Sequence, residues 1–224
     1  MNILTPTADG SNTLFNEQVG EHYHSKHGAV QESRHVFIRA GLEAAMPGKH
    51  QLAVFEVGFG TGLNFLLSLD TCLRAGVSLH YTAVEAFPLS FETIADIGYR
   101  QFVMPAAWQA FEQSYGPALQ AAHELPLHGK LEIATGTFQT YGSGGRFDVL
   151  YYDAFSVRHQ PEMWTDELIT RAAALLKPGG LFVTYAITGK LKRALKACGC
   201  TIEKLPGAPG KREMLRATRQ PVAG

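Results

Sequence analysis

From residue 52 onward, the spacing of apolar residues switches repeatedly between two patterns. Short apolar runs rich in Val, Leu, Ile, Phe and Tyr are typical of buried strands, and they lie at 52–57, 79–85, 131–134, 147–152 and 181–185. Between them, apolar residues recur at the spacing of one helix face, which predicts helices at 63–73, 168–176 and 190–197. The alternation predicts a doubly wound, mostly parallel α/β sheet.

Some regions depart from this alternation. Residues 201–205 and 213–217 can pair as a C-terminal antiparallel hairpin, and the 168–176 helix should stop at the Pro and Gly residues of 177–180. Residues 99–130 place aromatic residues in a helical setting and have the character of an insertion. We expect an α/β domain over 41–224 with this insertion.

Composition places the chain among ordinary globular proteins. Of its 224 residues, 46% are hydrophobic and 18% charged, values that exclude disorder, collagen and coiled coil. No run approaches the roughly 20 apolar residues of a membrane span, and the N-terminus does not have the pattern of a signal peptide. Three cysteines are too few for a disulfide framework or a four-ligand zinc site. We therefore expect a cytoplasmic protein without membrane contact.

Charge is distributed unevenly, although the formal net charge is zero. Residues 177–224 contain ten basic and two acidic residues, whereas residues 1–176 contain ten basic and eighteen acidic ones. Such segregation can mark a face that binds a polyanion. The alternative is that Lys190, Lys192 and Arg193 form the solvated face of a helix. This pattern alone leaves both interpretations open.

The strongest motif is a glycine-rich turn between the first predicted strand and its helix, where residues 56–62 read EVGFGTG. Glycines here let the backbone approach a ligand and leave amide groups free at the helix N-terminus. The spacing of Gly58, Gly60 and Gly62 differs from the G-x-G-x-x-G that cradles a pyrophosphate. An acid at Glu56 suits an adenosyl ligand with a cationic amino-acid tail, as in class I, Rossmann-like S-adenosylmethionine methyltransferases. A structural turn without ligand is the alternative.

Two further strand ends carry candidate cofactor residues. Glu85 ends the second strand, where an acid can accept hydrogen bonds from both ribose hydroxyls; the alternative is a surface carboxylate. Gly136 and Thr137 follow the third strand, where many methyltransferases have an acid for the adenine amino group. This chain has no acid there, so Thr137 or a backbone group would replace it.

Asp153 ends the fourth strand and is the candidate catalytic residue. Ligands bind at the carboxyl ends of parallel strands, so its carboxylate should face the transferring methyl group or the incoming nucleophile. Only an unprotonated amine attacks, and a carboxylate can hold the ammonium and take its proton. No N-P-P-aromatic motif follows, which favours an aliphatic amine over a planar ring amine. The alternative is a capping role for Asp153 in the next turn.

The N-terminal residues 1–40 are polar, precede the first core strand and include His22, His24 and His27. These histidines have no fixed ligand spacing and no obvious carboxylate partner, so we do not expect a metal site. Tyr and His side chains can instead stack on a base. We therefore expect this arm to form a lid over the active site.

Several blocks resemble the methyltransferase half of the MnmC family, and together they cover nearly the whole chain. The matching blocks are 7–15, 20–29, 31–37, 55–64, 153–155, 161–164 and 205–217. The resemblance implies methyl transfer from S-adenosylmethionine to the 5-aminomethyl group of wobble (2-thio)uridine in tRNA. It also implies contact with the anticodon stem-loop. In MnmC an FAD-dependent half makes that substrate, so here we expect methylation alone, with a separate oxidoreductase as partner.

The resemblance also implies which residues form the site. Cofactor contacts are expected from Glu56, Gly58, Gly60, Gly62, Asn64, Glu85, Gly136, Thr137 and Asp153. Substrate contacts are expected from Tyr23, His24, Gln31, Glu32, Phe155, Lys211 and Arg212.

Two other functions remain open at this stage. A methyl or aminopropyl transferase acting on a small aliphatic amine would use Asp153 equally well. A nucleic-acid-binding module without catalysis is the other, and the presence of Glu56, the three glycines, Glu85 and Asp153 argues against it. The basic C-terminal segment favours the tRNA enzyme, because a small cationic amine would be repelled by it.

Overall fold

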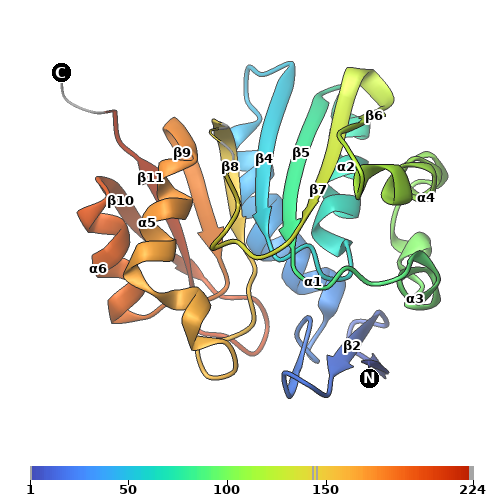
Figure 1. Cartoon of the computed structure of the whole chain (residues 1–224), viewed down its shortest axis with the longest axis horizontal. Coiled ribbons are helices and arrows are strands. Elements are labelled where there is room, and N and C mark those ends of the chain that lie inside the picture. The colour runs from blue at the N-terminus through green and yellow to red at the C-terminus, as the bar shows by residue number, and fades with distance from the viewer. Residues whose placement is uncertain (1, 143, 145, 222–224) are drawn as a thin grey trace.

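An eight-stranded mixed sheet forms the centre of the computed structural model, which describes residues 2–142, 144 and 146–221 (Figure 1). Residue 1 and residues 222–224, the outer ends of the expected arm and domain, lie outside the described residues, as do 143 and 145. The strand order is β10-β11-β9-β8-β4-β5-β7-β6. The parallel strands are β4 (Gln51–Val57), β5 (Ser78–Glu85), β7 (Gly129–Thr135), β8 (Phe147–Tyr152) and β9 (Leu176–Thr184). The antiparallel strands are β6 (His123–Leu125), β10 (Cys200–Pro206) and β11 (Glu213–Arg219).

Helices cover both faces of this sheet. One face carries the π-helix η1 (Arg34–Glu43), α2 (Leu63–Ala75) and α4 (Pro105–Ala118), and the other carries α5 (Asp166–Ala174) and α6 (Gly189–Ala197). Thr165 and Thr188 cap the N-termini of α5 and α6 with their side-chain oxygens, which satisfies amide groups that a helix start leaves unpaired. The start of each of these two helices is therefore stabilised by the threonine that precedes it.

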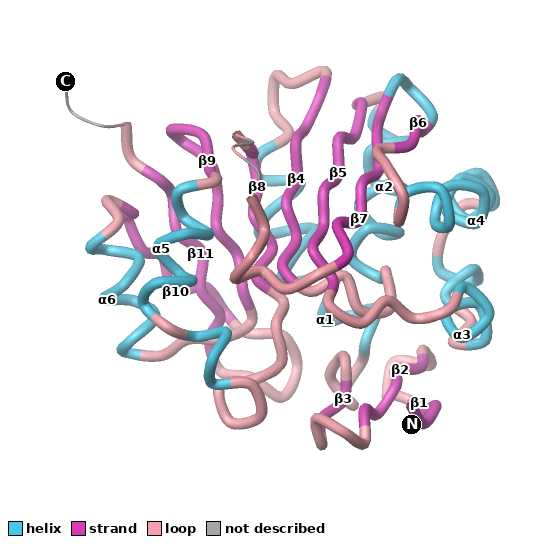
Figure 2. Tube along the Cα trace, in the orientation of Figure 1, coloured by secondary structure: helices cyan, strands magenta, loops and turns pink. Residues whose placement is uncertain are grey.

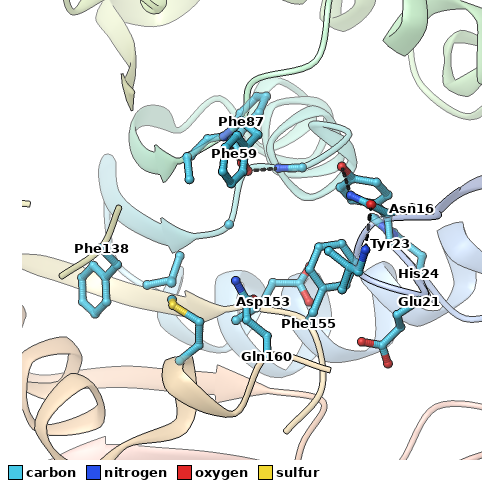
Figure 3. A pocket seen from close by; sticks show the side chains of 18 of the residues that line it. Asn16, Glu21, Tyr23, His24, Phe59, Phe87, Phe138, Asp153, Phe155 and Gln160 are labelled. Atoms are coloured by element: carbon cyan, nitrogen blue, oxygen red, sulfur yellow. Dashed lines mark hydrogen bonds between the residues drawn. The ribbon is translucent and has the colours of Figure 1, made fainter. Parts of the chain in front are cut away.

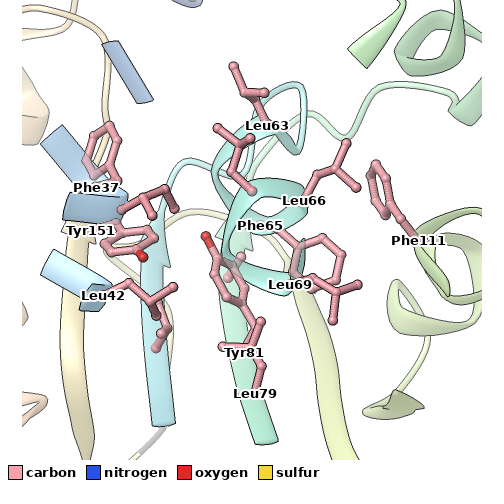
Figure 4. Packing of buried hydrophobic residues seen from close by; sticks show 14 of the residues in the cluster. Phe37, Leu42, Leu63, Phe65, Leu66, Leu69, Leu79, Tyr81, Phe111 and Tyr151 are labelled. Atoms are coloured by element: carbon pink, nitrogen blue, oxygen red, sulfur yellow. The ribbon is translucent and has the colours of Figure 1, made fainter. Parts of the chain in front are cut away.

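Strand alternation divides the core into two clusters. Along β8, Val149 and Tyr151 point to the face under η1 and α2, whereas Leu150 and Tyr152 point to the α5 and α6 face. The first cluster includes Phe37, Leu42, Phe65, Tyr81, Phe111 and Tyr151 (Figure 4). Both faces of the sheet are thus buried, as a doubly wound fold requires.

A small second sheet, built by the N-terminal residues, lies beside the carboxyl ends of the central strands (Figures 1 and 2). It contains β1 (Asn2–Pro6), β2 (Asn12–Asn16) and β3 (Glu21–His22), and the chain then enters α1 (Ala29–Ser33), which continues into η1. Asp9, between β1 and β2, connects the small sheet to α1, because its Oδ2 accepts a hydrogen bond from the Gln31 amide. The lid role expected for residues 1–40 stays a prediction.

The predicted strands, helices and C-terminal hairpin of the central sheet are confirmed, so the fold class predicted from the sequence is correct. One local expectation was wrong: residues 177–180 do not end a helix. The α5 helix already ends at Ala174, and β9 begins at Leu176. Leu176 pairs with Phe147 and Leu181 with Val149, so the intervening Pro and Gly residues form a bulge within β9.

The segment 99–130 connects β5 to β7 beyond α3 (Phe91–Asp96). It contains η2 (Tyr99–Phe102), α4, β6 and η3 (Pro126–His128). Helix α4 packs on α2 and on β7, so this segment supplies a layer of the fold. Its status as an insertion stays a prediction. Among the described helices, none is long and apolar enough to cross a membrane.

Candidate active site

A cavity of about 560 Å³ opens at the carboxyl ends of β4, β5 and β8 (Figure 3). Its walls come from segments far apart in the chain: the N-terminal sheet, the glycine loop after β4, and the loops after β5, β7 and β8. Loops at these strand ends come together because the strands are parallel. The sequence motifs at those ends therefore meet in one place.

The glycine loop forms the floor of the cavity through Gly58 and Gly60. Gly58 has φ +85°, and a Cβ there would lie 2.9 Å from the backbone oxygen of Asp153. Gly60 has φ +53°, and its Cβ would lie 3.0 Å from the Tyr23 ring. Both positions require glycine, because a side chain would be strained at a positive φ and would crowd the Asp153 backbone or the Tyr23 ring.

Glu85 holds the loop against the end of β5. Its Oε2 accepts a hydrogen bond from the Gly60 amide at 2.9 Å, and its Oε1 accepts one from the Phe87 amide at 2.9 Å. Phe87 lines the same cavity with 84% of its surface exposed. Sequence reasoning missed Phe87, although a large apolar residue two positions after the candidate ribose-binding acid Glu85 was a signal that could have found it. Gly136 and Thr137 line the neighbouring wall.

Glu56 lies behind the glycine loop rather than on the cavity. Strand alternation points it to the α2 face, where it is fully buried. Its Oε1 accepts a hydrogen bond from Asn64 and its Oε2 one from the Tyr81 hydroxyl, each at 2.8 Å. Burial, with the nearby Asp153 carboxylate, raises the pKa of Glu56 well above its usual range.

Gly62 and Asn64 also lie outside the cavity walls. Gly62 is the N-cap of α2, and a Cβ there would lie 2.7 Å from the Phe111 ring. Asn64 is buried on the first turn of α2. The two residues support the loop from behind.

Asp153 reaches the cavity from the end of β8. Its amide donates to the Val57 carbonyl at 3.1 Å, which fixes it beside the glycine loop, and its Oδ2 accepts a hydrogen bond from Asn64 at 2.8 Å. Burial raises the pKa of Asp153 to about 7, and the charge of Glu32 adds to this shift. A carboxyl group that titrates near neutral pH can exchange a proton with an amine.

An ion pair beside Asp153 joins the two ends of the chain. The Lys211 ammonium lies 2.6 Å from Glu32 Oε1 and 3.9 Å above the ring centre of Tyr185. Glu32 Oε2 accepts a hydrogen bond from the Ser25 amide. Lys211 and Glu32, both expected as substrate residues, therefore lie together on one wall, whereas the expected Gln31 and Arg212 are not among the residues that line the cavity.

Aromatic residues from the segment after β3 and from the loop after β8 cover the opposite side. The rings of Tyr23 and Phe155 lie 5.1 Å apart between their centres (Figure 3). His24 lines the cavity too, and neither of its buried ring nitrogens has a hydrogen-bond partner among the described residues. Burial lowers the pKa of His24 to about 4, so its imidazole is neutral at neutral pH.

Glu21 is a further cavity residue that sequence reasoning missed. Its Oε2 accepts a hydrogen bond from the Ser156 amide at 2.8 Å. This bond joins β3 to the loop after β8, across 135 positions of sequence, and no local signal could have indicated it. Within the described residues, the structure contains no group of three or more His, Cys, Asp or Glu side chains that could hold a metal ion.

The geometry suits an adenosyl cofactor with a positively charged tail. Gly58 and Gly60 line the cavity with bare backbone, since a Cβ at either would meet the Asp153 backbone or the Tyr23 ring, and the Glu85 and Asp153 carboxylates border this cradle. The sheet order and the place of this cradle define a class I methyltransferase. Residues 104–220 match the model of a family described as S-adenosyl-L-methionine-dependent methyltransferase, and the chain belongs to that family.

Similar proteins support this assignment and confirm the resemblance to MnmC. The chain is 34% identical over 209 residues to the tRNA 5-methylaminomethyl-2-thiouridine biosynthesis bifunctional protein MnmC of Magnetococcus marinus. This alignment covers 87% of this chain and 30% of the relative. It is 31% identical to the MnmC protein of Paracidovorax citrulli over 94% of this chain and 34% of that relative. The chain thus spans about a third of the length of the curated relatives it matches.

Solved structures share the fold. MNMC2 from Aquifex aeolicus matches 100% of this chain and 72% of its own, with a TM-score of 0.76 and 23% identity. A putative class I S-adenosylmethionine-dependent methyltransferase from Listeria monocytogenes matches 82% of this chain and 58% of its own, with a TM-score of 0.51 and 15% identity. At these identities the likeness shows the architecture alone.

Proposed function

We propose that this chain transfers a methyl group from S-adenosylmethionine to the 5-aminomethyl group of wobble (2-thio)uridine in tRNA, which gives the 5-methylaminomethyl form. The observation that carries the proposal is the place of the Asp153 carboxylate, which lines the cavity beside the glycine loop and is held there by Asn64. The relatives match this chain over most of its length, and their names indicate which amine is the methyl acceptor. A small aliphatic amine is the competing acceptor.

The cofactor side of the cavity comprises Gly58, Gly60, Glu85, Gly136 and Thr137. The two loop glycines allow close backbone approach, and Glu85 is positioned for ribose hydroxyls. The exposed Phe87 ring offers an apolar surface at the same wall. When bound, S-adenosylmethionine would supply the methyl group from its positively charged sulfur: the sulfur–methyl bond would break as the amine nitrogen takes the methyl group, and S-adenosylhomocysteine, a neutral thioether, would leave.

Asp153 is the residue that prepares the amine. Its Oδ2 is held by Asn64, so its Oδ1 is available to accept a hydrogen bond from a substrate ammonium. The ionised carboxylate takes or relays the proton, which leaves the nitrogen lone pair free to form the new N–C bond. The positioning of this amine contributes much of the rate, because well-oriented groups gain about 7–11 kcal/mol.

Residues that follow β3 and β8 hold the base. Tyr23 and Phe155 present aromatic surface for a base that has left the stack, and the neutral His24 offers one donor and one acceptor to its polar edge. Arg212 is exposed on the loop between β10 and β11, next to the cavity residue Lys211, where it can contact tRNA phosphates. The anticodon stem-loop would then lie across this loop and the N-terminal sheet.

The relatives are named as bifunctional proteins, and this chain spans about one third of their length. We propose that an FAD-dependent oxidoreductase activity supplies the aminomethyl group. Because the substrate is tRNA, we place the reaction in the cytoplasm.

The test is methyl transfer from labelled S-adenosylmethionine to bulk tRNA from cells that do not have this methylation activity. Nucleoside digestion and mass analysis should find the label in 5-methylaminomethyl-(2-thio)uridine. The Asp153→Asn variant is the matched control, and it should bind the cofactor but leave the tRNA unlabelled. If tRNA stays unlabelled while the wild-type protein binds cofactor and methylates a free alkylamine, the small-amine function replaces this one.

A further inference from the structure

The side chain of Asn64 bridges two carboxylates at the back of the cavity. Asn64 lies on the first turn of α2 with 3% of its surface exposed. Its Nδ2 donates to Glu56 Oε1 and to Asp153 Oδ2, both at 2.8 Å. An amide nitrogen carries two hydrogens, so each carboxylate receives one of them.

The orientation of this amide is fixed by the same two contacts. If nitrogen and oxygen were exchanged, the carbonyl oxygen would face two carboxylate oxygens, which are acceptors as well. In the observed orientation Asn64 Oδ1 is buried without a hydrogen-bond partner among the described residues. The protein thus leaves one buried acceptor unpaired to keep both donors on the carboxylates, and such a cost is unusual unless the arrangement has a role.

We infer that Asn64 is a positioning residue for Asp153: its amide holds the Asp153 carboxylate in its ionised form and turns the free oxygen toward the cavity, while Glu56 takes the second hydrogen. The catalytic part of this inference rests on the proposed function. The hydrogen-bonded arrangement itself does not, because it is present without substrate.

The electrostatic surroundings explain why Asp153 needs this donor. Besides Glu56, the titratable or charged groups that interact with it are Glu21 on β3, Tyr81 on β5, Glu32 on α1, Lys211 on the β10–β11 loop and Tyr185 after β9. Glu21 and Glu32 oppose its ionisation, as burial does, whereas Lys211 favours it. The Asn64 hydrogen bond lowers the pKa of Asp153 against these effects and so keeps it at about 7.

Glu56 behaves differently although it shares the donor. It is fully buried on the α2 face, and burial together with the Asp153 charge raises its pKa well above the usual range. A charge on Asp153 therefore opposes a charge on Glu56, and of these two carboxylates only Asp153 lines the cavity.

The decisive experiment measures the Asp153 carboxyl group directly in protein without ligands. Carbon-13 labelled aspartate gives a carboxyl signal that titrates with pH, and the Asp153→Asn variant assigns it. In the wild type the midpoint should lie near 7. In Asn64→Leu, which removes both donors at similar volume, the midpoint should rise by about one pH unit.

Two control variants define the direction of the effect. Glu32→Gln removes a charge that opposes ionisation, so its midpoint should fall. Ser68→Ala lies one turn further along α2, where its hydroxyl bonds the Asn64 backbone oxygen but not the amide, and it should leave the midpoint unchanged. A loss of stability alone would not move Asn64→Leu and Glu32→Gln in opposite directions.

The kinetic readout is the pH dependence of methyl transfer to tRNA. The acid limb of kcat should shift upward in Asn64→Leu by the same amount as the carboxyl midpoint, with little change in cofactor affinity. An unchanged midpoint in folded Asn64→Leu overturns the inference. If circular dichroism shows that this variant does not fold, Asn64→Ser, which keeps a single donor, must shift the midpoint in the same direction. If Asn64→Leu shifts the Asp153 midpoint but the wild-type protein does not methylate tRNA, the proposed function is overturned and the positioning role of Asn64 is retained.

Discussion

At Asp153 the protein keeps a carboxyl group in surroundings that oppose its charge. Burial and Glu32 raise its pKa to about 7, so near neutral pH it is only partly ionised. If the ionised form prepares the amine, activity must increase as pH rises through this value and must be lost below it. Initial rates at saturating substrates between pH 5.5 and 9 should show an acid limb with a midpoint near 7. A flat profile over this range would contradict the role.

Replacement of the same residue tests the role independently of pH. Asp153→Asn keeps the size and the ability to accept a hydrogen bond, but it cannot take a proton at neutral pH. We expect kcat to fall by about 10²–10⁴-fold, the usual contribution of a positioned general base, whereas calorimetric titration should find cofactor affinity nearly unchanged. The unchanged fold should be checked by circular dichroism. Near wild-type turnover would exclude Asp153 as the proton acceptor.

At the scale of the elements, the turn between β4 and α2 is specified by its glycines. Gly60 combines φ +53° with a Cβ position 3.0 Å from the Tyr23 ring. We expect Gly60→Ala to lower cofactor affinity by about tenfold or more, because the left-handed strain of about 1–2 kcal/mol and the added methyl group both act at the cavity floor. Calorimetric titration with S-adenosylmethionine measures the change.

Gly76 offers a matched control for that substitution. It ends α2 with φ +66°, and a Cβ there meets no atom within 4 Å. Gly76→Ala therefore introduces similar backbone strain away from the site, so it should lower the melting temperature and leave cofactor affinity unchanged. Equal loss of affinity in both variants would mean that general strain, and not the shape of the cradle, explains the effect.

The central sheet could be predicted because each of its elements carries its own apolar pattern. Strands such as β8 are buried on both faces and appear as continuous apolar runs. The N-terminal sheet could not be predicted, because β1 and β3 are short and only partly buried, and the two large apolar residues of β1, Ile3 and Leu4, are exposed. The π-helical geometry of η1 could not be predicted either, because the extra residue per turn relative to an α-helix leaves no distinct signal in the sequence.

The site divides in the same way. The glycine loop, Glu85 and Asp153 could be predicted, because each follows a strand in the local sequence and parallel strand ends meet. The Lys211–Glu32 pair joins residues 179 positions apart, and no local pattern indicates such a contact. Glu56 was expected to contact the cofactor. The alternation of side chains along β4 instead points it to the α2 face of the sheet, where it bonds Asn64 and does not line the cavity.

At the scale of the whole molecule, several of the basic residues in the C-terminal segment 177–224 have a structural use. Lys177 pairs with the buried Asp148, Arg216 with Glu203, and Arg219 donates to backbone oxygens near the end of α5. Lys211 faces inward to Glu32. The local excess of positive charge is therefore a poor guide to the tRNA surface, and exposed cations beside the cavity matter more.

Arg212 is such a cation, since it is exposed on the loop that carries the cavity residue Lys211. If it contacts a phosphate, Arg212→Glu should weaken tRNA binding and reduce the slope of log affinity against log salt by about 1. Fluorescence anisotropy at several salt concentrations measures both. Lys130→Glu makes the same charge change near the amino end of β7, at the sheet edge away from the cavity, and should leave the slope closer to the wild type. Identical slopes in the two variants would indicate a long-range effect of net charge, because a local phosphate contact is removed in only one of them.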